Sequence, residues 1–151
     1  MPLLTFAGRE AFAARAPAPA VTDLGGGVQL VAGEVNVLAL GSPEGLLMVD
    51  GGPKAQSAAL LRAALKATGA RRLHTLVNTH WHPEVTGLNE QAGKQGARII
   101  AQENTRLWLA RKRPIVTDWL PRGFGPIPAK AVPNHSFFSR EEFTFGGETI
   151  V

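Results

Sequence analysis

The segment from residue 25 to residue 52, GGGVQLVAGEVNVLALGSPEGLLMVDGG, constrains the fold most, because its pattern is typical of short strands. Runs of β-branched and leucine residues alternate there with Gly, Asn and Pro-Glu-Gly turn signals. Runs bounded in this way predict three strands joined in hairpins. The ordered part of the chain is therefore expected to begin with a small antiparallel sheet.

A helix and a buried strand are predicted to follow these strands. Pro53 suits the first turn of a helix and Gly69 is a typical stop residue. Between them, apolar residues recur at helical spacing: Ala58, Leu61, Ala64 and Leu65. The run LHTLVN, residues 73 to 78, then predicts a buried strand. Strands followed by alternating β and α segments favour an α/β or α+β layered domain.

The second half of the chain continues this alternation. In chain order its pattern predicts a short helix at 88–94, a strand at 97–101, a helix capped by Asn104 that ends at Arg113, a Pro-rich loop at 114–136, and a hairpin at 141–151. The last hairpin has Gly146 and Gly147 at its turn. We expect the chain to stop inside the second strand of that hairpin.

Composition narrows the classes of partner. The chain has 151 residues, 44% of them hydrophobic and 19% charged, which is typical of one globular domain. The 16 basic residues are scattered except for the run from Arg111 to Arg113, so we expect no nucleic-acid partner. No apolar run is long enough to span a bilayer, so we expect no membrane partner. With no cysteine, a metal would need imidazole and carboxylate ligands.

The first 22 residues are rich in alanine and proline and are interpreted as a flexible leader, with the domain at residues 23–151. Arg9, Glu10 and Arg15 interrupt the apolar core that a signal peptide needs. The leader is also compatible with the remnant of an export signal whose start lies upstream. The first interpretation implies a cytoplasmic protein, and the second implies a periplasmic one.

The stretch NTHWHPEVTG, residues 78 to 87, contains the candidate metal ligands. Pro83 disfavours helical geometry at His82, and in an extended segment the side chains of His80 and His82 point the same way. Glu84 follows His82 by two residues, so in an extended segment its side chain would point the same way. Two imidazoles and a carboxylate suit zinc. The alternative is that a His-x-His pair on a loop is only a polar turn.

A wider stretch, LVNTHWHPEVTGLNEQAGKQGARIIAQENTRLWL, resembles the first metal-binding motif of the metallo-β-lactamase-fold hydrolases, His-x-His-x-Asp-His after a buried strand. The upstream LLMVDGGP is similar to that family's strand ending in an Asp-x-Gly turn. The resemblance covers residues 25 to 151. It implies an α+β protein with the N-terminal half of the family's αβ/βα layered sandwich.

The resemblance also implies roles for single residues. His80 and His82 match the two histidines of the first metal site. Glu84 occupies the aspartate position, which in the family ligates the second metal and orients the attacking water, so it is both a metal ligand and a catalytic candidate. Asp50 matches the carboxylate that orients a ligand. Val85 stands at a histidine position and cannot bind a metal, so at most one zinc ion is expected.

Two functions follow from this degenerate motif. One is zinc-dependent hydrolysis of a small-molecule ester, thioester or lactam, impaired because the family's later ligands lie outside this chain. The other is a non-catalytic fold remnant or interaction module that has lost its metal site and self-associates through an unpaired sheet edge. Among the remaining candidates, His135 is interpreted as a surface histidine, and Trp108 and Trp119 as packing residues. Trp81 is interpreted as a packing residue or as an aromatic wall.

Overall fold

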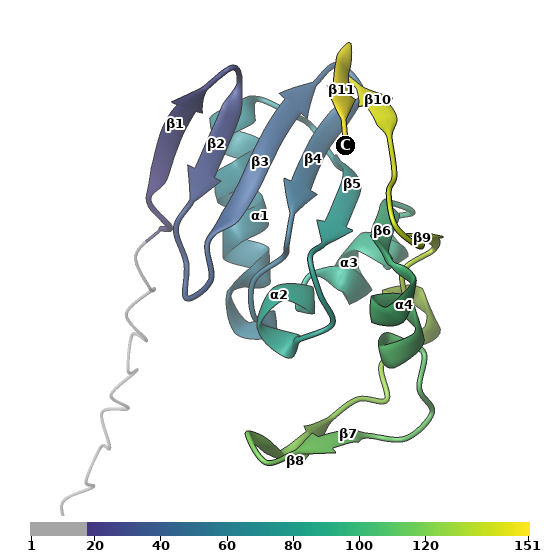
Figure 1. Ribbon diagram of the computed structural model, residues 1–151. Coiled ribbons are helices and arrows are strands. Elements are labelled where there is room, and N and C mark those ends of the chain that lie inside the picture. Colours follow the sequence, from purple (N-terminus) through teal and green to yellow (C-terminus); the bar gives the residue numbers. More distant parts are fainter. Residues whose placement is uncertain (1–17) are drawn as a thin grey trace, which may run out of the picture.

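A seven-stranded mixed sheet organises the protein, whose computed structural model describes residues 18–151 (Figure 1). The strands lie in the order β1-β2-β3-β4-β5-β6-β9. The first four pair antiparallel, and β4, β5, β6 and β9 pair parallel. Their bounds are β1 Val21–Gly25, β2 Val28–Val31, β3 Val37–Ser42, β4 Gly45–Val49, β5 Leu73–Asn78, β6 Arg98–Gln102 and β9 His135–Phe137.

Helices pack against this sheet and close the core. They are α1 Lys54–Thr68, α2 Pro83–Thr86, α3 Asn89–Lys94 and α4 Glu103–Leu109, with a 3-10 turn, η1, at Ala129–Ala131. The long helix α1 contacts β2, β3 and β4, and α3 contacts β5 and β6. Several core side chains are fully buried, including Leu46, Met48, Leu60, Leu76 and Ile99. Burying each of these contributes about 1.5–3 kcal/mol.

Two further hairpins form separate two-stranded sheets, toward opposite ends of the main sheet in Figure 1. One is formed by β7 Ile115–Thr117 and β8 Leu120–Phe124, and the other by β10 Phe143–Phe145 and β11 Glu148–Ile150. In the second hairpin the turn residues Gly146 and Gly147 both have positive φ, 61° and 89°. This geometry favours glycine and matches the predicted turn. Phe145 is buried beside the ring of His74, with ring centroids 5.6 Å apart.

Most of the predicted elements are confirmed. The helix from Pro53 to Gly69 is present as α1, and Gly69 adopts the left-handed conformation that ends it. The strand at 73–78 is present as β5. The short helix at 88–94 and the strand at 97–101 are present as α3 and β6, each beginning one residue later than expected.

The three strands predicted within residues 25–52 are present as β2, β3 and β4, and a further strand, β1, precedes them from Val21; residues 1–17 lie outside the described residues. Two expectations differ from the structure. Helix α4 ends at Leu109 and is capped by Gln102, whose side chain accepts the N–H of Asn104. The segment 114–136 is not a plain loop, because it contains β7, β8, η1 and the start of β9. Within residues 18–151, no helix combines the length and apolar character needed to cross a membrane.

Candidate metal centre

The histidine motif lies where the parallel strands β4 and β5 end. Asp50 directly follows β4, and His80 comes two residues after the end of β5. Open α/β sheets place their sites at the carboxyl ends of parallel strands. The Asp50 N–H donates to the Val77 carbonyl at 2.7 Å, which holds the two strand ends together. The motif is thereby fixed against the turn that carries Asp50.

The short helix α2 is anchored to the same turn. The Gly51 N–H donates to the Val85 carbonyl at 2.7 Å, and the Gly87 N–H donates to the Gly52 carbonyl at 3.0 Å. A side chain at Gly87 would collide with the backbone of Gly52 and Lys54. The glycine therefore allows the close approach that positions α2, and with it the histidine motif.

His80, His82 and Glu84 converge on one point. Their ligand atoms all lie within 4.8 Å of one another, and the two imidazole rings meet edge-on with centroids 4.5 Å apart. His82 has φ −60° and ψ 146°, the extended geometry expected before Pro83. Glu84 reaches the point differently from the prediction, because it lies in the first turn of α2 rather than in an extended segment.

A hydrogen-bonded chain orients His80. The Thr79 hydroxyl donates to Asp50 Oδ2 at 2.8 Å, and the Thr79 N–H donates to Asp50 Oδ1 at 2.9 Å. Since the hydroxyl has only one proton, it accepts from His80 Nδ1, 2.9 Å away. This arrangement leaves His80 Nε2 with a free lone pair. Asp50 thus acts on His80 through Thr79.

Asp50 is held in an unusual state. It is buried, and it is the one non-glycine residue with positive φ, 63°, among residues 18–151. Burial raises its pKa above the ordinary value of 3.8, while the two hydrogen bonds from Thr79 and the nearby His80 lower it. A strained and desolvated carboxyl is typical of functional sites.

Glu84 contacts the second histidine directly. The His82 Nδ1–H donates to Glu84 Oε1 at 3.0 Å, which leaves His82 Nε2 with a free lone pair. The second oxygen of Glu84 has no hydrogen-bond partner among the described residues. Glu84 is therefore placed to orient His82 with one oxygen and to offer the other to a metal or a water.

The donor set fits zinc. Two imidazole nitrogens and a carboxylate oxygen are the ligands zinc accepts when sulfur is absent, and three protein ligands leave a position open. Val85 is 2% exposed and offers no donor. Among residues 18–151, no second group of three or more His, Asp or Glu residues gathers in this way.

An aromatic cluster borders the histidines, and it includes Trp119, which the sequence interpretation treated only as a packing residue. Trp119, in the turn between β7 and β8, lies with its ring centroid 4.5 Å from that of His82. Trp81 stacks on Trp108 at 5.1 Å with an interplanar angle of 13°. The guanidinium of Arg111 lies 3.6 Å from the centre of the Trp108 ring. The aromatic-wall interpretation of Trp81 therefore extends to Trp119, whose position depends on the unpredicted hairpin.

His135 lies in a different environment. Its Nε2 is 2.6 Å from Glu141 Oε1, and the Arg98 guanidinium donates to the same oxygen at 3.2 Å. The ring of Phe143 covers Arg98 at 5.1 Å. His135 therefore belongs to an ion-pair cluster that joins β6, β9 and the residues before β10, and its side chain is only 35% exposed.

One known protein family matches most of this chain. The family model described as the metallo-beta-lactamase superfamily matches residues 30–147. The chain belongs to this superfamily. The resemblance and the fold class predicted from the sequence are thereby confirmed. No curated protein sequence matches the chain.

Solved structures agree with this assignment. A metallo-beta-lactamase with a HARLDQ motif from Cronobacter sakazakii is 26% identical with a TM-score of 0.68, and the match covers 85% of this chain and 52% of that chain. The subclass B3 enzyme BJP-1 from Bradyrhizobium japonicum is 17% identical, with a TM-score of 0.66 and coverage of 87% and 50%. The class B3 di-zinc enzyme LRA-12 from an Alaskan soil metagenome is 18% identical, with a TM-score of 0.70 and coverage of 87% and 50%. The last two likenesses show the fold alone, and this chain spans about half the length of all three proteins.

Proposed function

We propose that this protein binds one zinc ion through His80, His82 and Glu84, and that its chemistry is hydrolysis of an ester, thioester or lactam at a reduced rate. The observation that carries the proposal is the convergence of the three ligand atoms within 4.8 Å. Membership of the metallo-beta-lactamase superfamily supports the choice of reaction class.

Each residue of the site has a separate proposed role. His80 and His82 present Nε2 lone pairs because their Nδ1 protons are held by Thr79 and Glu84. When bound, zinc polarises a carbonyl and makes a water more acidic. The free oxygen of Glu84 is placed to accept a proton from a water at the site. Asp50 fixes the position of His80 through Thr79 and adds negative charge near the imidazole.

The reduced rate follows from the number of donors. The described residues supply two imidazoles and one carboxylate, and the buried Val85 adds none. A metal held by fewer ligands binds more weakly, and the catalytic carboxylate is also hydrogen-bonded to His82. We therefore expect hydrolysis to depend on added zinc.

A matched pair of variants tests metal binding. His80→Gln removes an imidazole from the cluster, whereas His135→Gln removes one from the ion-pair cluster. Equilibrium dialysis should find about one zinc per wild-type chain and per His135→Gln chain, and His80→Gln should bind at least about tenfold more weakly, a loss of about 1.4 kcal/mol. Less than about a tenth of an equivalent in the wild type, or equal binding in His80→Gln, would remove the metal site. Hydrolysis of a chromogenic lactam, a p-nitrophenyl ester and a thioester, with and without zinc, tests the reaction class.

A second candidate function, an interaction module, is favoured by exposed apolar side chains. Leu24 is 54% exposed, Leu38 37% and Phe138 82%. Among the described residues, β11 pairs only with β10, so its outer edge is open. The partner we propose is a second copy of the chain. Sedimentation velocity at several concentrations would reveal a dimer, and a monomer throughout would exclude this function.

A further inference from the structure

We propose a second binding site, beyond the zinc function, in a cavity beside α2: a site for a small amphiphilic carboxylate, whose apolar body fills the cavity and whose carboxylate pairs with Lys54. The cavity measures about 450 Å³, within the roughly 300–1,000 Å³ typical of small-molecule sites. His80 and His82 are not part of its lining. The site is therefore separate from the zinc ligands, apart from Glu84, which borders both.

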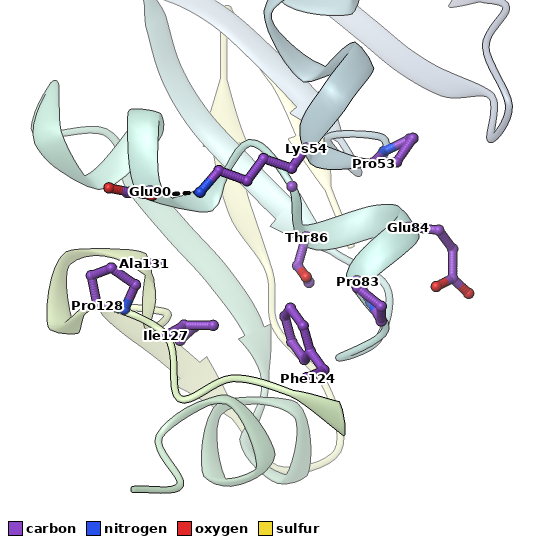
Figure 2. A pocket seen from close by; sticks show the side chains of 11 residues that line it. Pro53, Lys54, Pro83, Glu84, Thr86, Glu90, Phe124, Ile127, Pro128 and Ala131 are labelled. Carbon is purple, nitrogen blue, oxygen red and sulfur yellow. Dashed lines mark hydrogen bonds and ion pairs between the residues drawn. The ribbon is translucent and has the colours of Figure 1, made fainter. Parts of the chain in front are cut away.

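The walls suit an apolar group. Figure 2 shows two side chains facing the cavity: the Phe124 ring, at the end of β8, and Ile127, in the segment between β8 and η1. The apolar lining consists of Pro53, Pro83, Phe124, Ile127, Pro128 and Ala131. Proline and aromatic rings lose little conformational entropy when a ligand packs on them. An apolar body of one or two rings would remove this lining from water.

The charges around the cavity do not by themselves select an anion, and the preference depends on which charged group can change partner. Two carboxylates line the cavity: Glu84 accepts from His82 through one oxygen, and Glu90 Oε1 accepts from Lys94 at 2.7 Å. The Lys54 ammonium makes a longer contact, 3.3 Å to Glu90 Oε2, and its side chain is 83% exposed (Figure 2). Lys54 can therefore turn to a ligand while Glu90 keeps Lys94 as its partner.

The start of α1 adds to this preference. Pro53 and Lys54 line the cavity; Pro53 precedes the 15-residue helix α1, and Lys54 is its first residue. The first turn of α1 contains no acidic residue, and no side chain caps it. The positive end of the helix dipole therefore acts together with the Lys54 ammonium on any anion held there. A neutral or cationic ligand would gain from neither.

The test uses 1-naphthoate as the probe and follows backbone amide signals of the full chain by NMR. Saturable shifts are expected at Thr86, Gly87, Phe124, Ile127 and Ala131. Shifts confined to β1–β3 instead, or no saturable shift at the cavity, would overturn the proposal. The neutral analogue 1-naphthalenemethanol should bind about fivefold more weakly than the carboxylate. Equal affinity for the two probes would overturn the carboxylate specificity.

A matched lysine pair tests the anion contact. Lys54→Gln should weaken naphthoate about fivefold. Lys66→Gln, which removes the same charge from the last turn of α1, should leave it within about twofold, because Lys66 does not line the cavity. Equal weakening in both variants would overturn the assignment of Lys54. Naphthoate binding should also persist in His80→Gln, and this result separates the cavity site from the zinc site.

Discussion

Two histidine–carboxylate pairs in this protein look alike and differ in their third partner. His82 lies 3.0 Å from Glu84, and His135 lies 2.6 Å from Glu141. The first pair is joined by a second imidazole, that of His80, whereas the second pair is joined by the guanidinium of Arg98. The same two residue types therefore occur in two different chemical settings.

The third partner decides what each pair can do. An imidazole with its Nδ1 proton committed offers a lone pair, so His80 adds a ligand. A guanidinium carries only donors and a permanent charge, so Arg98 occupies the carboxylate where a cation would bind. The first pair is therefore suited to a metal, and the second is a structural tie between β6, β9 and the segment before β10.

The largest effect is expected from removing the carboxylate charge behind the metal ligands. Asp50→Asn tolerates the positive φ but weakens the link through Thr79 to His80. We expect zinc affinity to fall by about 10–100-fold. Competition with a chelator measures it. Glu141→Gln, the matched change at the other pair, should leave zinc affinity unchanged, and a similar loss there would break the distinction between the pairs.

The next effect comes from completing the family motif at the first pair. Glu84→Asp combined with Val85→His supplies the shorter carboxylate and an added imidazole. We expect zinc to bind about tenfold more tightly, or about 1.4 kcal/mol. Because Val85 is buried, thermal unfolding must be measured alongside. Unchanged affinity in a folded double variant would mean that α2 does not present position 85 to the metal.

A smaller effect concerns the exposure of each histidine ring to solvent. Trp119 packs on the His82 ring, so Trp119→Ala should expose that imidazole and speed its reaction with diethyl pyrocarbonate severalfold, as measured by peptide mass spectrometry. His135 should react at an unchanged rate. Val116→Ala, on the same hairpin and 64% exposed, serves as the control. An unchanged rate at His82 in Trp119→Ala would show that the hairpin does not cover the site in solution.

The smallest effect is a pH dependence near the second pair. Hydrogen bonds from Arg106 and from Ser136, on β9 beside His135, lower the pKa of Glu103 from 4.5 to about 2. A lowered pKa means that the stabilising contribution is present above pH 4.5 and is lost as pH falls through about 2. Wild type should therefore exceed Glu103→Gln in stability above pH 4.5, with the difference shrinking toward pH 2 in urea unfolding. A difference that stays constant over this range would contradict the assignment.

The sequence predicted the part of the site that depends on local geometry. The buried strand β5 and the extended His82 before Pro83 follow from neighbouring residues, and the turn at Asp50 was implied by the family resemblance. Glu84 was predicted at the site by alternation along an extended chain, yet it arrives through the first turn of α2. A proline restricts the residue before it and also favours helix initiation after it, and the second effect was overlooked.

Other parts depend on contacts between distant segments and had no local signal. Trp119 approaches His82 because residues 114–136 contain the hairpin β7–β8. The strands of this hairpin are short, and the segment around them is rich in proline and glycine. The environment of His135 depends on Arg98, 43 positions away from Glu141. The interpretation of His135 as a surface histidine did not include its carboxylate partner, and the side chain is 35% exposed in the structure. Such pairings are set by the packing of the sheet rather than by periodicity.

Zinc-edge X-ray absorption on the 1:1 zinc complex tests most directly whether His80 and His82 form a two-imidazole metal site. We expect two imidazoles and oxygen donors around the metal, with one imidazole lost in His80→Gln and both retained in His135→Gln. A spectrum with a single imidazole in the wild type, or one that loses an imidazole in His135→Gln, would contradict it.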